Sequence, residues 1–190
     1  MQSQVTFVSA CKTNPDRQAH LLALRYCIIG KNESMPAAMP AHTNPANINA
    51  ENSKQNKPTK QMKMLLVEDS KLLRDILFDA ISHVDNINVT ASAATQKQAI
   101  SLLDESQFDI VLLDIELAQG NGFEVIKHLQ QDNYAFKKPI LMMLTNHAHP
   151  HYRNLAKTLG VPYFFDKSMD FDLAIDAITV EANRFSSAPH

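Results

Sequence analysis

Five polar residues in this sequence lie at or just beyond the ends of short apolar stretches. Glu68 and Asp69 follow MLLV, Asp114 follows IVLL, Thr145 follows ILMML, and Lys167 comes after VPYFFD. Three carboxylates held together repel one another, so at least one would be protonated at neutral pH unless a cation were present. Oxygen ligands of this kind suit Mg²⁺. With Lys167 as a further positive charge and the Thr145 hydroxyl as a hydrogen-bond donor, the set predicts a phosphoryl-transfer site with Asp114 as nucleophile.

These side chains share a site only if the apolar stretches are parallel strands of one sheet. The run from Ile110 to Leu113 is unbroken and rich in branched residues, which is typical of a strand buried on both faces. We expect strands at 64–67, 88–94, 110–113, 140–144 and 161–165, alternating with helices at 70–83, 95–107, 123–129, 150–159 and 171–185. This alternation predicts an α/β fold with right-handed crossovers, although it leaves the strand order open. In every such order the carboxyl ends of the strands share one edge, where the five polar residues lie.

The order of these residues resembles a known family, the receiver domain of two-component response regulators. The resemblance covers about residues 62–185 and is carried by Glu68, Asp69, Asp114, Gly122, Thr145, Phe164 and Lys167. It implies a flavodoxin-like, doubly wound, five-stranded parallel sheet with strand order 2-1-3-4-5. On this basis we expect a receiver domain at residues 62–186, followed by a short tail at 187–190.

The resemblance also implies a role for each site residue. Asp114 would accept a phosphoryl group from a phosphohistidine, in reach of Lys167. Asp69 would bind Mg²⁺ directly, Glu68 would act mostly through water, and the backbone carbonyl of Glu116 would complete the metal shell. The switch residues of the family match Thr145 and Phe164, which would move together on signalling.

Some positions depart from the common family pattern. Ala118 stands where a proline usually follows the acceptor, and Ser168 replaces a proline that often follows the lysine with a cis bond. Asn146 is larger than the small residue usual after the threonine. Glu116 and His147 occupy the two variable positions that flank the site, and we expect the acidic Glu116 to affect the lifetime of the acyl phosphate.

Residues 1–61 differ in composition from the rest of the chain. They contain seven Lys or Arg, three Asp or Glu, and five of the nine prolines, whereas residues 62–190 contain eleven basic and seventeen acidic residues. We expect residues 1–61 to be a disordered extension or an artefact of start-site choice. The acidic body argues against nucleic acid as a partner. No apolar run reaches the ~20 residues of a membrane helix, and both cysteines lie in the extension, so we expect a cytoplasmic protein.

The expected function is that of a single-domain response regulator, because the chain ends soon after the fifth predicted helix. It would take phosphate from a histidine kinase or histidine phosphotransfer protein. It would then relay the phosphate or dock a partner through the surface of the fourth helix, fifth strand and fifth helix. Apart from self-catalysed phosphoryl transfer and autodephosphorylation, we expect no enzymatic activity.

Other functions are weaker interpretations of the same residues. A phosphorylation-independent interaction module would typically lack one of the acceptor residues, and all are present here. A phosphatase of the haloacid-dehalogenase type would need a second aspartate where Glu116 stands. Flavin binding would need a phosphate-cradling loop after the first strand, where EDSKLLR offers carboxylates. The histidines in NHAHPHY lack a supporting ligand cluster for a transition metal, and we assign the remaining acids, Asp104, Glu105, Asp170, Asp172 and Asp176, to solvated helix faces.

Overall fold

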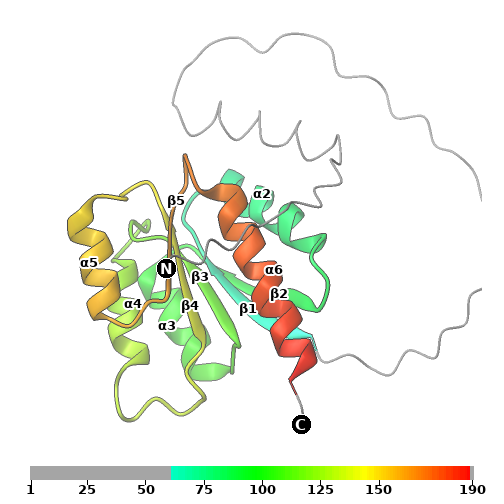
Figure 1. Ribbon diagram of the computed structural model, residues 1–190. Helices are drawn as coiled ribbons and strands as arrows, with labels where there is room; N and C mark the ends of the chain where they lie inside the picture. The colour runs from blue at the N-terminus through cyan, green and yellow to red at the C-terminus, as the bar shows by residue number, and fades with distance from the viewer. Residues whose placement is uncertain (1–60, 189–190) are drawn as a thin grey trace, which may run out of the picture. The chain divides into compact units, whose positions relative to one another are not determined.

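The computed structural model describes residues 61–188 as a five-stranded parallel sheet with helices between the strands (Figure 1). The elements, in chain order, are β1 (Met62–Val67), α2 (Lys71–Ser82), β2 (Ile87–Ala93), α3 (Gln96–Glu105), β3 (Ile110–Leu113), α4 (Gly122–Leu129), β4 (Ile140–Thr145), α5 (Pro150–Thr158), β5 (Tyr163–Asp166) and α6 (Phe171–Ser187). The strand order is β2-β1-β3-β4-β5, and every neighbouring pair is parallel. The predicted flavodoxin-like order is therefore confirmed.

Helices cover both faces of the sheet. α2 and α6 lie on one face, and α3, α4 and α5 lie on the other (Figure 1). Side chains along a strand alternate between the two faces, so each central strand needs apolar residues at every position. All four residues of β3 are buried, as are the last four of β1. This double burial explains why the IVLL run was recognisable from sequence.

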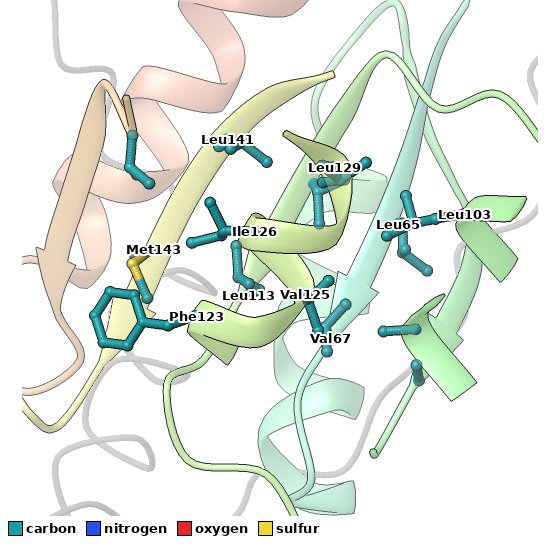
Figure 2. Packing of buried hydrophobic residues seen from close by; sticks show 14 of the residues in the cluster. Leu65, Val67, Leu103, Leu113, Phe123, Val125, Ile126, Leu129, Leu141 and Met143 are labelled. Carbon is teal, nitrogen blue, oxygen red and sulfur yellow. The ribbon is translucent and has the colours of Figure 1, made fainter. Parts of the chain in front are cut away.

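The larger core lies between the sheet and the α3–α4–α5 layer. Alternate strand residues contribute to it, including Leu65, Val67, Leu113 and Met143. Figure 2 shows these residues packed against Leu103 of α3 and against Phe123, Val125, Ile126 and Leu129 of α4. This packing fixes where the carboxyl end of each strand lies, and hence the position of the residues that follow the strand.

The predicted elements are all present, with shifts at some boundaries. β1 starts two residues earlier than predicted, at Met62, and β5 runs from Tyr163 to Asp166 rather than over 161–165. Val161 is buried but precedes the strand, because its N–H donates to the Ala156 carbonyl at the end of α5. Apolar character therefore marked Val161 as core, although it does not pair in the sheet.

The expectations for the extension lie outside the described residues. None of the helices in residues 61–188 is long and apolar enough to cross a membrane. The described peptide bonds include no cis bond, so the bond between Lys167 and Ser168 is trans.

Candidate phosphoacceptor site

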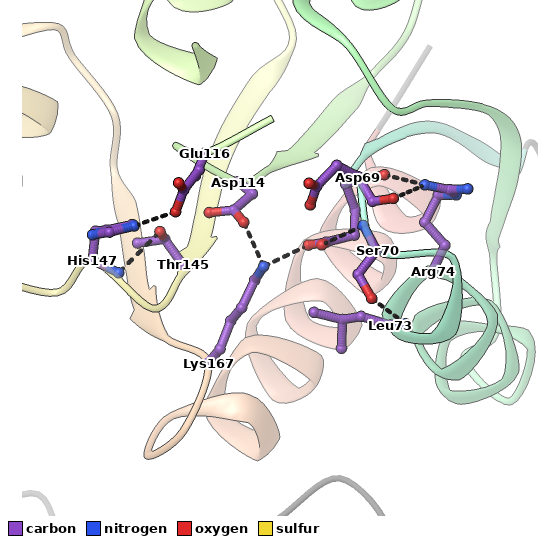
Figure 3. Close-up of polar contacts among 10 residues, drawn as sticks. Asp69, Ser70, Leu73, Arg74, Asp114, Glu116, Thr145, His147 and Lys167 are labelled. Carbon is purple, nitrogen blue, oxygen red and sulfur yellow. Dashed lines mark hydrogen bonds and ion pairs between the residues drawn. The ribbon is translucent and has the colours of Figure 1, made fainter. Parts of the chain in front are cut away.

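Four of the predicted site residues meet at the carboxyl edge of the sheet. Glu68 follows β1, Asp114 follows β3, Thr145 ends β4 and Lys167 follows β5, and all four side chains are buried. Figure 3 shows Asp114, Thr145 and Lys167 at this edge. A buried charge is costly unless it is paired. The charges of Glu68, Asp114 and Lys167 are paired with one another, and the Thr145 backbone carbonyl accepts from the Lys167 N–H at 3.0 Å.

Lys167 joins the two buried carboxylates. Its Nζ lies 2.5 Å from Asp114 Oδ2 and 2.7 Å from Glu68 Oε2. Burial raises the pKa of the Glu68 carboxyl, and the Lys167 charge opposes only part of this effect. Burial by itself lowers the pKa of Lys167, but the charges of Asp114 and Glu68 outweigh it, so the pKa of Lys167 lies above its ordinary value. The ammonium group is thus charged at neutral pH.

The loop after β1 is shaped by its own side chains. Ser70, at the start of the predicted helix, caps α2, because its Oγ accepts a hydrogen bond from the Leu73 N–H. The Ser70 N–H in turn donates to Glu68 Oε1 at 3.1 Å. The Arg74 guanidinium donates to the backbone carbonyls of Glu68 and Asp69, at 2.5 and 2.9 Å. These contacts hold the acidic pair at the strand end and leave the Asp69 side chain exposed.

The loop after β3 passes very close to the acceptor backbone. A Cβ atom on Gly122 would lie 2.1 Å from the Asp114 carbonyl oxygen, so only glycine fits there. Asn121 caps α4 by accepting from the Phe123 N–H. Ala118, where a proline was expected from the resemblance, is tied to the neighbouring loop because its N–H donates to the Ala94 carbonyl at 3.2 Å.

The acidic residues fit a divalent cation. Glu68, Asp69 and Asp114 each offer a carboxylate oxygen, and these oxygens lie within 4.8 Å of one another. Asp114 Oδ1 is buried and accepts no hydrogen bond from any described residue. A buried carboxylate oxygen without a donor is suited to a cation, and an all-oxygen set suits Mg²⁺. Glu68 is paired with Lys167, and its expected contact with the cation, mostly through water, stays a prediction.

Glu116 and His147 meet across the mouth of the site. The resemblance identifies both as variable positions that flank the site but implies no contact between them. In the structure, His147 Nε2 lies 2.6 Å from Glu116 Oε2 (Figure 3). The His147 N–H also donates to Thr145 Oγ1 at 3.2 Å, which ties this contact to the threonine. Each residue stands two positions beyond a site residue on adjacent strands, and that equal offset is the signal by which sequence could have paired them.

The two predicted switch residues differ in their surroundings. Thr145 is fully buried, whereas Phe164 is half-buried and packs against the core. Arg153 of α5, which sequence reasoning missed, lies 4.8 Å from the centre of the Phe164 ring, and its Nη1 donates to the Phe164 carbonyl at 3.1 Å. Nothing in the local spacing of Arg153 predicts these contacts, because they join separate strand–helix units.

Two of the acids assigned to solvated helix faces also make specific contacts. Asp104 Oδ1 lies 2.7 Å from His128 Nε2, which links α3 to α4. Asp170 accepts a hydrogen bond from the Asp166 N–H at 3.0 Å. Within residues 61–188, the acidic group at the sheet edge is the one cluster of three potential metal ligands, so the loop histidines do not form a second. His149 instead caps α5 by accepting from the His151 N–H.

Comparisons with known proteins identify what this arrangement is similar to. A family model described as the response regulator receiver domain matches residues 64–179. The transcriptional regulatory protein PmrA of Pectobacterium parmentieri is 33% identical over 82 residues, which cover 43% of this chain and 35% of that protein. A protein-glutamate methylesterase/protein-glutamine glutaminase of Methanococcus maripaludis is 32% identical over 84 residues, covering 44% of this chain and 22% of that protein. The chain thus spans only about a fifth to a third of these relatives' lengths.

A solved structure gives the same picture for the fold. The non-phosphorylated HemR receiver domain from Leptospira biflexa is 28% identical and superposes with a TM-score of 0.54 over 68% of this chain and 98% of that chain.

Proposed function

This chain belongs to the response regulator receiver family of two-component signalling, and we propose that Asp114 accepts a phosphoryl group from the phosphohistidine of a histidine kinase or histidine phosphotransfer protein. The observation that supports this proposal is the buried carboxylate at the end of β3, with Lys167 on one oxygen and no hydrogen-bond donor among residues 61–188 on the other. An anionic carboxylate needs no base to become a nucleophile.

The transfer is a displacement at phosphorus. An oxygen of Asp114 forms a bond to phosphorus while the bond from phosphorus to the donor imidazole nitrogen breaks, and the imidazole leaves with that electron pair. Asp69, Asp114 and the backbone carbonyl of Glu116 would hold Mg²⁺, with Glu68 beside them, and the ion would neutralise charge on the phosphoryl oxygens.

The chain's own residues supply the remaining interactions. The Lys167 ammonium turns from the carboxylate toward a phosphoryl oxygen, where its charge offsets the charge that develops in the transition state. The Thr145 hydroxyl donates to another phosphoryl oxygen, which draws Thr145 toward the acceptor. We expect Phe164 to move with Thr145 and to change the surface of α5, β5 and α6 to which a partner binds. Alternatively, the phosphoryl group is relayed onward.

We further propose that the protein is a signalling domain rather than an enzyme acting on an external substrate, and that it acts in the cytoplasm. The match to the Methanococcus maripaludis methylesterase covers only 22% of that protein, so its enzymatic activity is not carried over to this chain. Glu116 also stands where a haloacid-dehalogenase-type phosphatase needs its second aspartate.

The proposal is tested by incubating the protein with Mg²⁺ and acetyl phosphate and following intact mass. The wild type and an Asp132→Asn variant, which changes an exposed aspartate, should both gain one phosphoryl group. Asp114→Asn should gain none, and omission of Mg²⁺ should suppress labelling. Equal labelling of wild type and Asp114→Asn, or labelling of neither, would rule out Asp114 as the acceptor. A partner that binds both forms equally would favour the phosphorylation-independent module.

A further inference from the structure

The loop that carries Lys167, residues 166–170, is closed by polar contacts that the proposed phosphoryl transfer does not use. Asp166 Oδ1 accepts from the Ser168 N–H at 2.8 Å, and the Asp166 carbonyl accepts from the Asp170 N–H at 2.7 Å. Asp170 Oδ2 in turn accepts from the Asp166 N–H at 3.0 Å. The loop backbone is therefore bonded on both sides of Lys167.

Asp170 makes this contact in place of an ordinary helix cap. It occupies the N-cap position of α6, where an aspartate normally accepts a hydrogen bond from the first turn, but its side chain makes no capping hydrogen bond. The other four described helices all have a side-chain cap, provided by Ser70, Thr95, Asn121 and His149. The Asp170 carboxylate is turned back onto the loop before the helix.

Arg153 reaches the same loop from α5. Its Nη2 lies 3.6 Å from Asp170 Oδ2, and its Nη1 donates to the Phe164 carbonyl at 3.1 Å. Its Nε also donates to the Ala148 carbonyl at 3.3 Å, in the loop between β4 and α5. One guanidinium group thus connects the strand before Lys167, the loop around Lys167 and the loop that follows Thr145.

We propose that Asp170 and Arg153 are positioning residues for Lys167, an inference that rests on the proposed function of the site. A lysine has a long flexible stem, so its ammonium group is placed accurately only if its backbone is fixed. Ser168 stands in place of a proline, so no pyrrolidine ring restricts the backbone after Lys167. The contacts among Asp166, Ser168, Asp170 and Arg153, here called the loop brace, restrict it. The loop brace holds the backbone from which Lys167 reaches Asp114 and Glu68 at 2.5 and 2.7 Å.

The first test measures how fast acetyl phosphate labels Asp114 at saturating Mg²⁺, at a temperature at which every variant is folded. Asp170→Ala should slow labelling by about ten- to a hundredfold, because misplacing a catalytic group by about 1 Å can have an effect of this size. The Mg²⁺ concentration for half-maximal labelling should stay unchanged, since Asp170 touches no carboxylate of the metal group. Asp170→Asn keeps an oxygen that can accept from the Asp166 N–H and should recover most of the rate.

Matched variants separate positioning from a general effect of charge or stability. Asp172→Asn removes a neighbouring exposed charge in the first turn of α6 and should label at the wild-type rate. Arg153→Lys should retain more activity than Arg153→Ala, because a cation can still pair with Asp170. The inference is overturned if Asp170→Ala labels at the wild-type rate, or if Asp172→Asn slows labelling equally.

A second test does not depend on phosphorylation. In a double-mutant cycle, the urea midpoints of unfolding are compared for Asp170→Ala, Lys167→Met and the double variant. If the loop brace holds Lys167 in its ion pairs, Asp170→Ala should shift the midpoint less when Lys167 is absent. Equal shifts in both backgrounds would overturn the inference. If wild type takes no phosphate, the proposed function fails, and the cycle alone decides the role of Asp170.

Discussion

Replacing Lys167 with methionine should destabilise the fold at neutral pH and make its stability more sensitive to Mg²⁺. Methionine has a similar length but no charge, so the change removes the cation between Asp114 and Glu68. The carboxylate oxygens of the acidic group lie within 4.8 Å of one another. At an effective dielectric constant of about 20, two unit charges at that separation repel by roughly 3–4 kcal/mol. Removing one partner of a buried ion pair costs about 3–5 kcal/mol, so we expect a loss of that size in the free energy of unfolding at pH 7.

The deficit should depend on pH in a defined direction. Burial raises the pKa of Glu68 in the folded state, and Lys167 opposes part of that rise. Without Lys167 the pKa of Glu68 should rise further. A group with a raised folded-state pKa contributes stability that is present below its unfolded pKa and lost as pH rises through the folded pKa. The stability of Lys167→Met relative to wild type should therefore fall as the pH rises from about 4 toward 7.

Urea unfolding followed by circular dichroism measures both effects. Titration with Mg²⁺ should stabilise Lys167→Met more than wild type, because the metal replaces the missing positive charge and no longer competes with the ammonium group. Lys157→Met, at an exposed position of α5, is the control and should match wild type. If Lys167→Met is as stable as wild type at pH 7, or if Mg²⁺ stabilises both proteins equally, the electrostatic account of the site is wrong.

Three further predictions concern other contacts. Glu116→Ala breaks the exposed hydrogen bond with His147 and should speed loss of the phosphoryl group by opening the entrance to the site, by at most about tenfold, since such a hydrogen bond contributes roughly 0.5–1.5 kcal/mol. Leu77→Ala should reduce the free energy of unfolding by about 2–5 kcal/mol, because the side chain is buried against the sheet. The hydrogen bond from Tyr163 to Glu181 raises the pKa of Tyr163, so its stabilising contribution is lost as the pH rises through that value, and Tyr163→Phe should show a weaker loss of stability above about pH 10.

Each of these predictions has a matched control and a result that would contradict it. Glu124→Ala changes an exposed acid of α4 and should leave the dephosphorylation rate as in wild type, and an unchanged rate in Glu116→Ala would remove its proposed role. Leu72→Ala on the exposed side of α2 should cost less than about 0.5 kcal/mol, and an equal cost at both leucines would contradict the assigned packing. Ser186→Ala, at an exposed position of α6 without an ionisable group, should keep the wild-type alkaline profile, whereas an identical profile for Tyr163→Phe would show that its hydrogen bond does not matter.

Local pattern predicted most of the fold because the sheet is buried on both faces. The four residues of β3 were predicted at both ends, since an unbroken branched run has few other stable placements. The helix start predicted at residue 70 was equally readable, because the Ser70 hydroxyl accepts from the backbone N–H of Leu73, the third residue of α2. The start of β5 was wrong by two residues, because burial of Val161 in a loop looks the same in sequence as burial in a strand.

The site was predictable only in part, for a physical reason. A residue at the end of a strand is placed by the topology, which is how Glu68, Asp114 and Lys167 could be brought together in advance. The partner of an exposed side chain is chosen by the paths of two loops, and no local spacing encodes those paths. The contacts of Arg153 with Phe164 and Asp170 belong to this second kind. The contact of His147 with Glu116 does not, because both residues stand two positions beyond a site residue on adjacent strands.

The surroundings of Asp114 make its two oxygens different from each other. In free aspartate they are equivalent by rotation, but here Oδ2 accepts from the Lys167 ammonium and Oδ1 has no donor from residues 61–188. The protein has removed the symmetry of the carboxylate before any ligand arrives. An incoming electrophile or cation therefore meets one occupied and one bare oxygen, and the regiochemistry at Asp114 is biased by the side of the sheet edge from which Lys167 approaches.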